Sequence, residues 1–151
     1  MKTADVIIVG SGASGLFNAL FLPQDYKVIV ITKKEVEESD SFLAQGGISA
    51  LKNPEDYDSY FEDTMKAGHY ENDKGAVEKM IKESPQIIQD LKDFGVRFDL
   101  KDGEIEFTRE GGHSTFRILH HEDLTGKEIT SHLYEEAKKR DNITIMENCT
   151  M

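Results

Sequence analysis

The sequence predicts an α/β fold, with a parallel sheet, flanking helices and an inserted β-hairpin. Two short apolar runs at residues 6–9 and 28–31 enclose a glycine-rich turn and an apolar helical stretch, and a third run at 143–146 follows another helical pattern. Strands that alternate with helices are typical of parallel sheets, because parallel neighbours need a crossover connection. Asp102-Gly103 separates two stretches of alternating apolar residues, which indicates a hairpin.

The first strand, at 6–9, runs directly into Gly10-Ser11-Gly12-Ala13-Ser14-Gly15. In a strand–turn–helix unit of this kind, the first glycine turns the chain sharply, the second lets a pyrophosphate approach the backbone, and the third lets the helix pack closely on the strand. The helix N-terminus adds unpaired N–H groups and the positive end of its dipole. With the second strand, residues 4–33 form a βαβ unit of about thirty residues, the length that this motif requires. We expect a Rossmann-like unit that binds a dinucleotide; the alternative is an ordinary glycine turn.

The end of the second strand argues against a simple NAD dehydrogenase. An NAD-binding unit places an acid there to bind the ribose hydroxyls. This chain has Ile31-Thr32-Lys33-Lys34 at that point, and its first acid, Glu35, comes late. FAD remains, and it also requires contacts to the flavin from a later segment.

The later elements are predicted from hydrophobic periodicity and from turn residues. Ser84 and Pro85 are expected to start a new helix as its N-cap and first helical residue, and Gly95 to end it. In chain order we expect a loop at 32–43, helices at 55–66 and 74–83, the helix that begins at Ser84, a hairpin at 96–107, a polar loop at 109–123, a helix at 127–140 and a strand at 143–146.

Length and charge restrict the classes of partner. The 151 residues are enough for one ordinary domain with a hydrophobic core. The 29 acidic residues outnumber the 18 basic ones, giving a net charge of −11, so we expect neither nucleic acid nor a membrane as a partner. Cys149 is the single cysteine, which excludes an internal disulfide and suits a reducing compartment. No secretory signal or membrane-spanning run is recognisable, so a cytoplasmic location is expected.

Three motifs carry a resemblance to a known family. Residues 40–48, Asp-Ser-Phe-Leu-Ala-Gln-Gly-Gly-Ile, resemble the flavin-contacting stretch of the succinate dehydrogenase, fumarate reductase and L-aspartate oxidase flavoproteins. Residues 31–33, Ile-Thr-Lys, and 108–114, Thr-Arg-Glu-Gly-Gly-His-Ser, are similar to the L-aspartate oxidases in particular. The resemblance covers the whole chain in order, although the matched proteins are several times longer.

The resemblance implies an incomplete domain. Residues 1–151 would be the N-terminal part of an FAD-binding domain, without the capping and C-terminal domains. The implied parts are a βαβ dinucleotide unit at 4–33, a flavin-contacting segment at 39–51, helices and a hairpin at 55–123, and a helix and strand at 126–148.

The resemblance further implies that FAD is bound without a covalent bond. Residues 11–14 would hold the pyrophosphate, Lys33 would lie at the adenosine ribose, and residues 40–47 would surround the flavin ring. Asp40 stands where the succinate and fumarate enzymes carry a histidine, which in many of them is bonded to FAD, and a carboxylate cannot form that bond. The implied cofactor-binding residues are Gly10, Ser11, Gly12, Ala13, Ser14, Gly15, Lys33, Asp40, Ser41, Phe42, Leu43, Ala44, Gln45, Gly46 and Gly47.

Glu110 lies where the L-aspartate oxidases place an acid that receives the α-ammonium of the substrate. The implied reaction is oxidation of L-aspartate to iminoaspartate, with oxygen or fumarate as electron acceptor. It would supply quinolinate and pyridine nucleotide biosynthesis, with quinolinate synthase as a candidate partner. The family's catalytic residues lie beyond Met151, so no catalytic residue is assigned in this chain. Two alternatives stay open: a fumarate reductase or succinate dehydrogenase flavoprotein, and a nucleotide-binding fragment without activity.

The histidines near the C-terminal helix raise the question of a metal site. His113, His120 and His121 lie close in sequence to acids, but adjacent histidines are expected to point to different sides, and no second ligand pair has zinc spacing. We therefore expect no metal. Arg117 is a candidate for pairing with a carboxylate.

Overall fold

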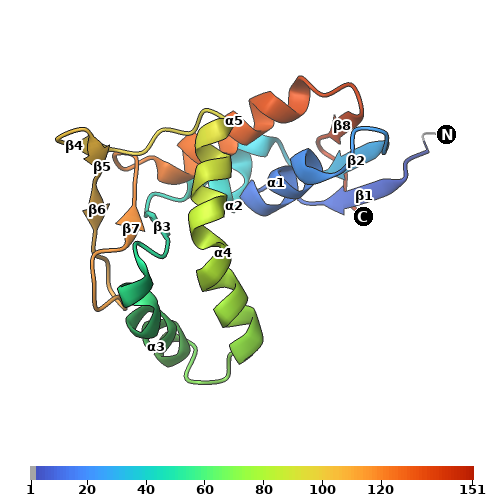
Figure 1. Ribbon diagram of the computed structural model, residues 1–151. Coiled ribbons are helices and arrows are strands. Elements are labelled where there is room, and N and C mark those ends of the chain that lie inside the picture. The colour runs from blue at the N-terminus through green and yellow to red at the C-terminus, as the bar shows by residue number, and fades with distance from the viewer. Residues whose placement is uncertain (1–2) are drawn as a thin grey trace. The chain divides into compact units, whose positions relative to one another are not determined.

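The computed structural model describes residues 3–151 and divides them into two compact units. The first unit comprises the chain up to Gly46, together with Phe94–Val96 and Leu124–Met151. The second comprises Gly47–Asp93 and Arg97–Asp123. Figure 1 shows the elements of both units.

The first unit is built on a parallel sheet in the order β1-β2-β8, formed by Val6–Val9, Val28–Ile31 and Ile143–Met146 (Figure 1). Helices α1 (Ala13–Phe21) and α5 (Thr125–Lys138) pack against each other. The core contains Ala19, Val28 and Val30, with Ile8, Leu22, Ile143 and Ile145 packed around them. The central strand is the most deeply buried because it has a neighbour on each side, which is why it reads as a continuous apolar run. The predicted α/β class, the βαβ unit and the last strand are confirmed.

The expected loop at 32–43 is wrong in its second half. A 3₁₀ turn, η1 (Val36–Glu38), and a short helix, α2 (Asp40–Leu43), lie there. The Ser39 hydroxyl caps α2 by accepting from the Phe42 N–H over 3.3 Å. Val36 is buried, and its N–H donates to Glu147, which is 111 positions away in the chain. Local sequence patterns cannot reveal a contact over that separation.

The second unit contains the two long α-helical segments α3 (Tyr57–Ala67), which follows the 3₁₀ turn η2 (Pro54–Asp56), and α4 (Lys74–Asp93). Tyr60, Met65, Val77 and Ile81 form a buried cluster between them. A small antiparallel sheet has the order β3-β7-β6, from Ile48–Ser49, Ile118–Leu119 and Phe107–Thr108. The hairpin β4-β5 pairs Leu100–Lys101 with Glu104–Ile105.

The hairpin turn is the one that the sequence predicts. Asp102 and Gly103 have φ values of +55° and +86°, so both central residues are left-handed, as a type I′ turn requires. Gly95, with φ of +90°, follows α4 and confirms the predicted stop.

The predicted restart of a helix at Ser84 is wrong, because α4 runs through Pro85 without a break. A proline inside a helix leaves the carbonyl four residues earlier without its usual donor. That carbonyl belongs to Ile81, and the Ser84 hydroxyl donates to it over 2.7 Å. The same hydroxyl accepts from the Leu51 N–H over 2.8 Å. Ser84 therefore supports a continuous helix instead of capping a new one.

The expected polar loop at 109–123 is also wrong in part, since it contains β7. Ile118 and Leu119 are buried, and β7 pairs with both β3 and β6. A strand of two residues is too short to show the alternation from which strands are recognised. Within residues 3–151, no helix has both the length and the apolar character needed to cross a membrane.

Candidate functional site

The glycine turn of the first unit has the geometry that its sequence predicts. Gly10 follows β1 with φ of +108°, a conformation that glycine adopts without strain. A Cβ on Gly15 would lie 2.1 Å from the Gly10 carbonyl oxygen and 3.4 Å from Cγ2 of Ile8. Only a glycine lets α1 lie this close to β1. The turn therefore fits a pyrophosphate, which needs close access to backbone N–H groups at a helix N-terminus.

An open cavity of about 570 Å³ lies next to this turn, in the range of small-molecule and cofactor sites. It brings together six of the predicted cofactor residues: Gly10, Ser11, Gly12, Lys33, Asp40 and Ser41. A second hollow, of about 580 Å³, is lined by Ser14 and Gly15 as well as by β1. Ala13 and residues 42–47 line neither of these two cavities.

The side chain of Ser11 points into the protein. It is buried, and its hydroxyl donates to the Thr32 hydroxyl over 2.9 Å. A phosphate would therefore meet the backbone of Ser11 and not its hydroxyl. The bond joins the turn after β1 to the residue that follows β2, which places Lys33 at the rim of the same cavity.

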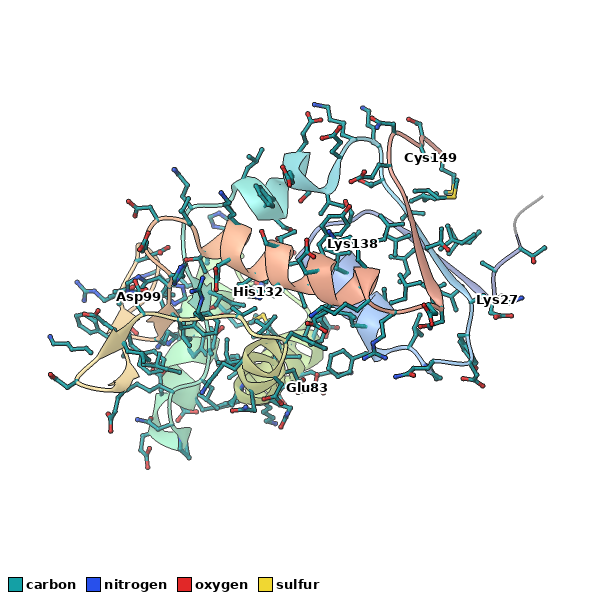
Figure 2. The ribbon with its side chains drawn as sticks, turned by 90° about the horizontal axis from the view of Figure 1, so that it is seen from above. Lys27, Glu83, Asp99, His132, Lys138 and Cys149 are labelled. Carbon is teal, nitrogen blue, oxygen red and sulfur yellow. The ribbon has the colours of Figure 1, made fainter. Side chains whose placement is uncertain are left out.

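Among the lining residues that the sequence reasoning missed, Cys149, Thr150 and Met151 lie farthest along the chain from the predicted segments. Figure 2 labels Cys149 on the segment that follows β8. The Cys149 N–H donates to the Thr32 carbonyl over 2.9 Å, which holds the segment beside β2. The only signal in the sequence was that this segment follows the predicted strand at 143–146. The ends of parallel strands lie at the same edge of a sheet, next to the glycine turn.

The predicted flavin-contacting segment begins in α2 and is supported by α5. The Gly126 N–H, in the first turn of α5, donates to the Ala44 carbonyl over 3.0 Å. A Cβ on Gly126 would lie 2.1 Å from the Ser41 carbonyl oxygen and 2.6 Å from that of Ala44. Gly126 is thus a further site residue that we did not predict, and a glycine at the start of a helix was its only signal. Leu43, Ala44, Gln45 and Gly46 are exposed.

In the second unit, the predicted substrate residue Glu110 lies on the loop between β6 and β7. Its Oε1 accepts a hydrogen bond from the Gly47 N–H over 3.0 Å. A Cβ on Gly47 would lie 2.2 Å from Cγ2 of Ile118, so the backbone of Gly47 passes directly over β7. The structure therefore brings Glu110 together with Gly47, a residue of the predicted flavin-contacting segment.

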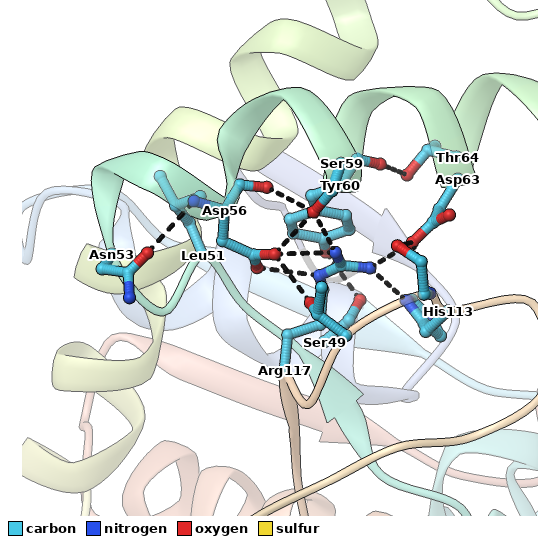
Figure 3. A network of polar contacts seen from close by, with 12 residues as sticks. Ser49, Leu51, Asn53, Asp56, Ser59, Tyr60, Asp63, Thr64, His113 and Arg117 are labelled. Carbon is cyan, nitrogen blue, oxygen red and sulfur yellow. Dashed lines mark hydrogen bonds and ion pairs between the residues drawn. The ribbon is translucent and has the colours of Figure 1, made fainter.

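Figure 3 shows the polar network around Arg117, a side chain with no exposed surface. Its guanidinium donates two hydrogen bonds of 2.8 Å to the Asp56 carboxylate and one of 2.6 Å to that of Asp63. It also lies over the ring of Tyr60, 4.8 Å from the centroid. The prediction that Arg117 pairs with a carboxylate is confirmed, and its partners are acids of this chain. Asp56 and Asp63 were missed; their spacing of seven residues, on one face of a helix, was the available signal.

His113 also belongs to this network. Its Nδ1 lies 3.1 Å from Nη1 of Arg117. A guanidinium can only donate, so Nδ1 accepts and the ring proton resides on Nε2.

Hydrogen bonding keeps the acids of this network ionised. Bonds from Arg117 hold the pKa of Asp56 far below its usual value. Burial raises the pKa of Asp63, but hydrogen bonds from Ser114 and Arg117 outweigh it, and the net shift is downward. The bond to Asp56 raises the pKa of Arg117. Asp56, Asp63 and Arg117 are therefore all charged at neutral pH.

The expectation that His120 and His121 point to different sides is wrong. Both Nδ1 atoms approach one carboxylate, that of Asp99, at 3.1 and 3.3 Å. The Glu122 N–H donates to the same carboxylate, and Glu122 has φ of +46°, so the backbone turns around Asp99. Within residues 3–151, no group of three or more His, Cys, Asp or Glu side chains could hold a metal ion.

The fold and the glycine turn define a nucleotide-binding protein of the flavoprotein class. The family model described as FAD binding domain matches residues 5–151. The chain therefore belongs to the FAD-binding domain family, and its cofactor is FAD.

The relatives identified by sequence are more particular. L-aspartate oxidase of Clostridium perfringens is 44% identical over 150 residues, covering 99% of this chain and 34% of the relative. L-aspartate oxidase of Clostridium acetobutylicum is 47% identical over 145 residues, covering 95% of this chain and 33% of the relative. The predicted resemblance to L-aspartate oxidases is confirmed, and the chain spans about a third of the length of these relatives.

Solved structures agree on the fold. A chain of E. coli quinol fumarate reductase has a TM-score of 0.89 at 25% identity, covering 96% of this chain and 26% of that chain. A chain of Mycobacterium smegmatis Sdh1 in complex with UQ1 has a TM-score of 0.84 at 28% identity, covering 97% of this chain and 28% of that chain.

Proposed function

We propose that the protein oxidises L-aspartate to iminoaspartate with FAD as cofactor. The observation that carries the proposal is the position of Glu110, whose carboxylate accepts a hydrogen bond from the Gly47 N–H. Relatives of this sequence at 44% and 47% identity are L-aspartate oxidases. FAD supplies the two-electron acceptor for the hydride that leaves the substrate Cα. Oxygen or fumarate would take the electrons onward. The product would enter the quinolinate route to NAD, with quinolinate synthase as a candidate partner in the cytoplasm.

The first unit would hold the cofactor. Residues 11–14 would bind the pyrophosphate through the backbone at the N-terminus of α1, and Lys33 would lie at the adenosine ribose. Residues 40–47 would contact the flavin. The glycine turn supports the first of these roles, because a side chain at Gly15 would meet the Gly10 carbonyl oxygen. The cavity supports the second, because Lys33 lines it together with the turn.

Glu110 would receive the α-ammonium of aspartate. A carboxylate has two oxygens with several lone pairs, so the bond from Gly47 to Oε1 leaves capacity for the substrate. An acid beside two substrate carboxylates would repel a ligand without an amine. Its presence therefore favours an amino acid over a plain dicarboxylate.

The test is Glu110→Gln in the FAD-loaded protein expressed from its complete reading frame. The change keeps the shape and removes the charge, a loss of about 1.5–3 kcal/mol for a charge-assisted bond. We expect kcat/KM for aspartate to fall about tenfold to a hundredfold, while the inhibition constant of succinate stays equal or improves. Glu104→Gln, at an exposed acid of the hairpin, is the control and should change neither. Equal losses for both ligands, or no oxidation of aspartate by the unmodified protein, would contradict the proposal.

The second candidate is a fumarate reductase or succinate dehydrogenase flavoprotein, which the structural neighbours favour by fold. Asp40 discriminates between the two. It is exposed at the start of α2 and lines the cavity, and its carboxylate cannot bond covalently to a flavin. We expect acid precipitation of the FAD-loaded protein to leave the yellow flavin in the supernatant. Flavin fluorescence that migrates with the denatured chain would favour the second candidate.

A further inference from the structure

The loop that carries Glu110 is fixed at both of its ends. It joins β6 to β7, which pair through Thr108 with Ile118. Just after Glu110, Gly112 has φ of +86°, and the His113 N–H donates to the Glu110 carbonyl over 3.2 Å. This bond closes a tight turn of four residues. Glu110 therefore begins a defined turn and does not lie on a free loop tip.

Two carboxylates, Asp63 of α3 and Asp56 of the turn η2 before it, hold the rest of the loop. The N–H and hydroxyl of Ser114 donate to Oδ2 of Asp63 over 2.7 and 2.8 Å. The Thr115 hydroxyl donates to Oδ1 of Asp56 over 2.7 Å. Arg117 joins the two acids from the end of the loop, through the bonds shown in Figure 3. Loop and helix are thus connected at residues 114, 115 and 117.

The hydrogen bond from the Gly47 N–H depends on where this loop places the Glu110 carboxylate. Its bond to Oε1 of Glu110 spans 3.0 Å and is exposed, so it forms only when the loop holds the carboxylate in that place. The backbone of Gly47 is itself fixed, because it lies against Ile118 of β7. A shift of the loop would therefore break the bond from the Glu110 side.

We propose that Asp56, Asp63 and Arg117 are positioning residues that hold Glu110 for the substrate ammonium. The proposal rests on the proposed function, since it takes Glu110 as the residue that binds the substrate. The three side chains act through the loop. A bidentate Arg–carboxylate pair fixes the orientation of the two side chains as well as their distance. The Tyr60 ring packs against the face of the Arg117 guanidinium. Tyr60 is in turn fixed by a 2.6 Å bond between its hydroxyl and that of Ser49.

The decisive variant is Asp63→Asn, which keeps the volume and removes the charge that holds Ser114 and Arg117. It is measured in the FAD-loaded protein from the complete reading frame, beside Asp58→Asn, an exposed acid of the same helix. We expect KM for aspartate to rise about tenfold, since small misplacements of binding groups are costly. We expect kcat to change by less than about threefold. The inhibition constant of succinate, which lacks the ammonium, should stay the same.

Hydrogen exchange gives a readout that does not depend on turnover. The peptide that contains Gly47 should exchange faster in Asp63→Asn and at the unmodified rate in Asp58→Asn. Ser114→Ala leaves the Arg117–Asp63 pair intact and removes one loop bond, so it should shift KM and exchange in the same direction by a smaller amount. This milder variant keeps the test available where Asp63→Asn folds poorly.

Two results would overturn the positioning role. One is an equal loss of affinity for aspartate and succinate in Asp63→Asn, which would indicate general damage. The other is unchanged exchange at Gly47. A failure of the proposed function is recognised separately: Glu110→Gln would then leave the preference for aspartate unchanged, whatever Asp63→Asn does to the exchange of Gly47.

Discussion

Single side chains supply hydrogen bonds that the backbone lacks or that hold distant segments together. Ser84 donates to the Ile81 carbonyl and accepts from the Leu51 N–H, so one hydroxyl bonds both a helix that contains a proline and the segment that follows β3. Arg117 holds distant segments together through ion pairs, because it bonds to Asp56 and Asp63, which lie 61 and 54 positions before it in the chain. Both side chains are buried, so both should be costly to change.

Ser84→Ala should lower the free energy of unfolding by about 2 kcal/mol, because it leaves a buried carbonyl and an N–H with one partner fewer. The loss should be smaller in a Pro85→Ala background, since that change restores a backbone donor for the Ile81 carbonyl. Urea unfolding of the two single variants and the double variant measures the coupling. Strict additivity would show that the Ser84 hydroxyl does not compensate for Pro85.

Asp56 makes stability depend on pH at acid values. Its pKa is lower in the folded protein than in the unfolded chain, so its contribution is fully present above the unfolded value of about 3.9. The contribution is lost as pH falls from there toward the folded pKa. Asp56→Asn should cost about 3 kcal/mol at pH 7, because it breaks a buried ion pair. The difference from the unmodified protein should shrink at pH 3.

Thermal or urea unfolding at the two pH values tests this expectation. The control is Glu78→Gln, which removes an exposed helical pair with Lys82 and should change stability by less than about 0.5 kcal/mol at either pH. A difference for Asp56→Asn that persists at pH 3 would locate its effect in packing instead of charge.

At the scale of elements, helix starts and turns position the candidate site. Gly10 and Gly15 let the N-terminus of α1 lie close to the end of β1. The N-terminus of α5 bonds to the segment that begins in α2. The β6–β7 connection carries Glu110, and Asp56 of η2 and Asp63 of α3 bond to this connection. Each of these segments is short, and each is held by contacts with another element of its own unit.

Gly126→Ala should weaken FAD binding at least about tenfold, as expected for a displacement of positioning groups. The new methyl group would lie 2.1 Å from the Ser41 carbonyl oxygen, so the segment at 41–44 must move. Gly75→Ala is a matched control, at the second residue of α4, where the nearest atom is the flexible Asp73 side chain at 3.3 Å. It should leave FAD affinity unchanged. Fluorescence titration of the apoprotein with FAD measures both variants, and equal affinities would remove the support role of Gly126.

At the scale of the whole molecule, the chain carries its glycine turn and the loop with Glu110 in different compact units. It also spans about a third of its relatives' length, at 34% of one relative and 33% of another. A chain of a third of that length has fewer residues with which to contact FAD and a substrate than the longer relatives have. This is the physical basis for treating a nucleotide-binding fragment without activity as an outcome for the isolated chain.

Residues 1–151 alone should hold FAD weakly and produce no peroxide from aspartate. Each lost factor of ten in affinity corresponds to about 1.4 kcal/mol of missing contacts. FAD titration and a peroxide assay of the purified 151-residue chain check both statements. Aspartate-dependent peroxide from that chain would show that the elements described here are sufficient for catalysis.

Local sequence by itself determined the βαβ unit, the hairpin turn and the stop at Gly95. In these places the decisive preferences are local. They are the apolar runs, the positive φ values that glycine adopts without strain, and the Asp102-Gly103 dipeptide that favours a type I′ turn. The motifs around Asp40 and Glu110 likewise identified the family before any contact was known. Only the tertiary structure decided that α4 continues through Pro85 and that Asp56 and Asp63 hold the loop between β6 and β7. The hold on the loop depends on hydrogen bonds between residues more than fifty positions apart. The continuity of α4 depends on the local bond from Ser84 to Ile81 and on the contact of Ser84 with the distant Leu51, so helix and turn propensities alone decide neither outcome.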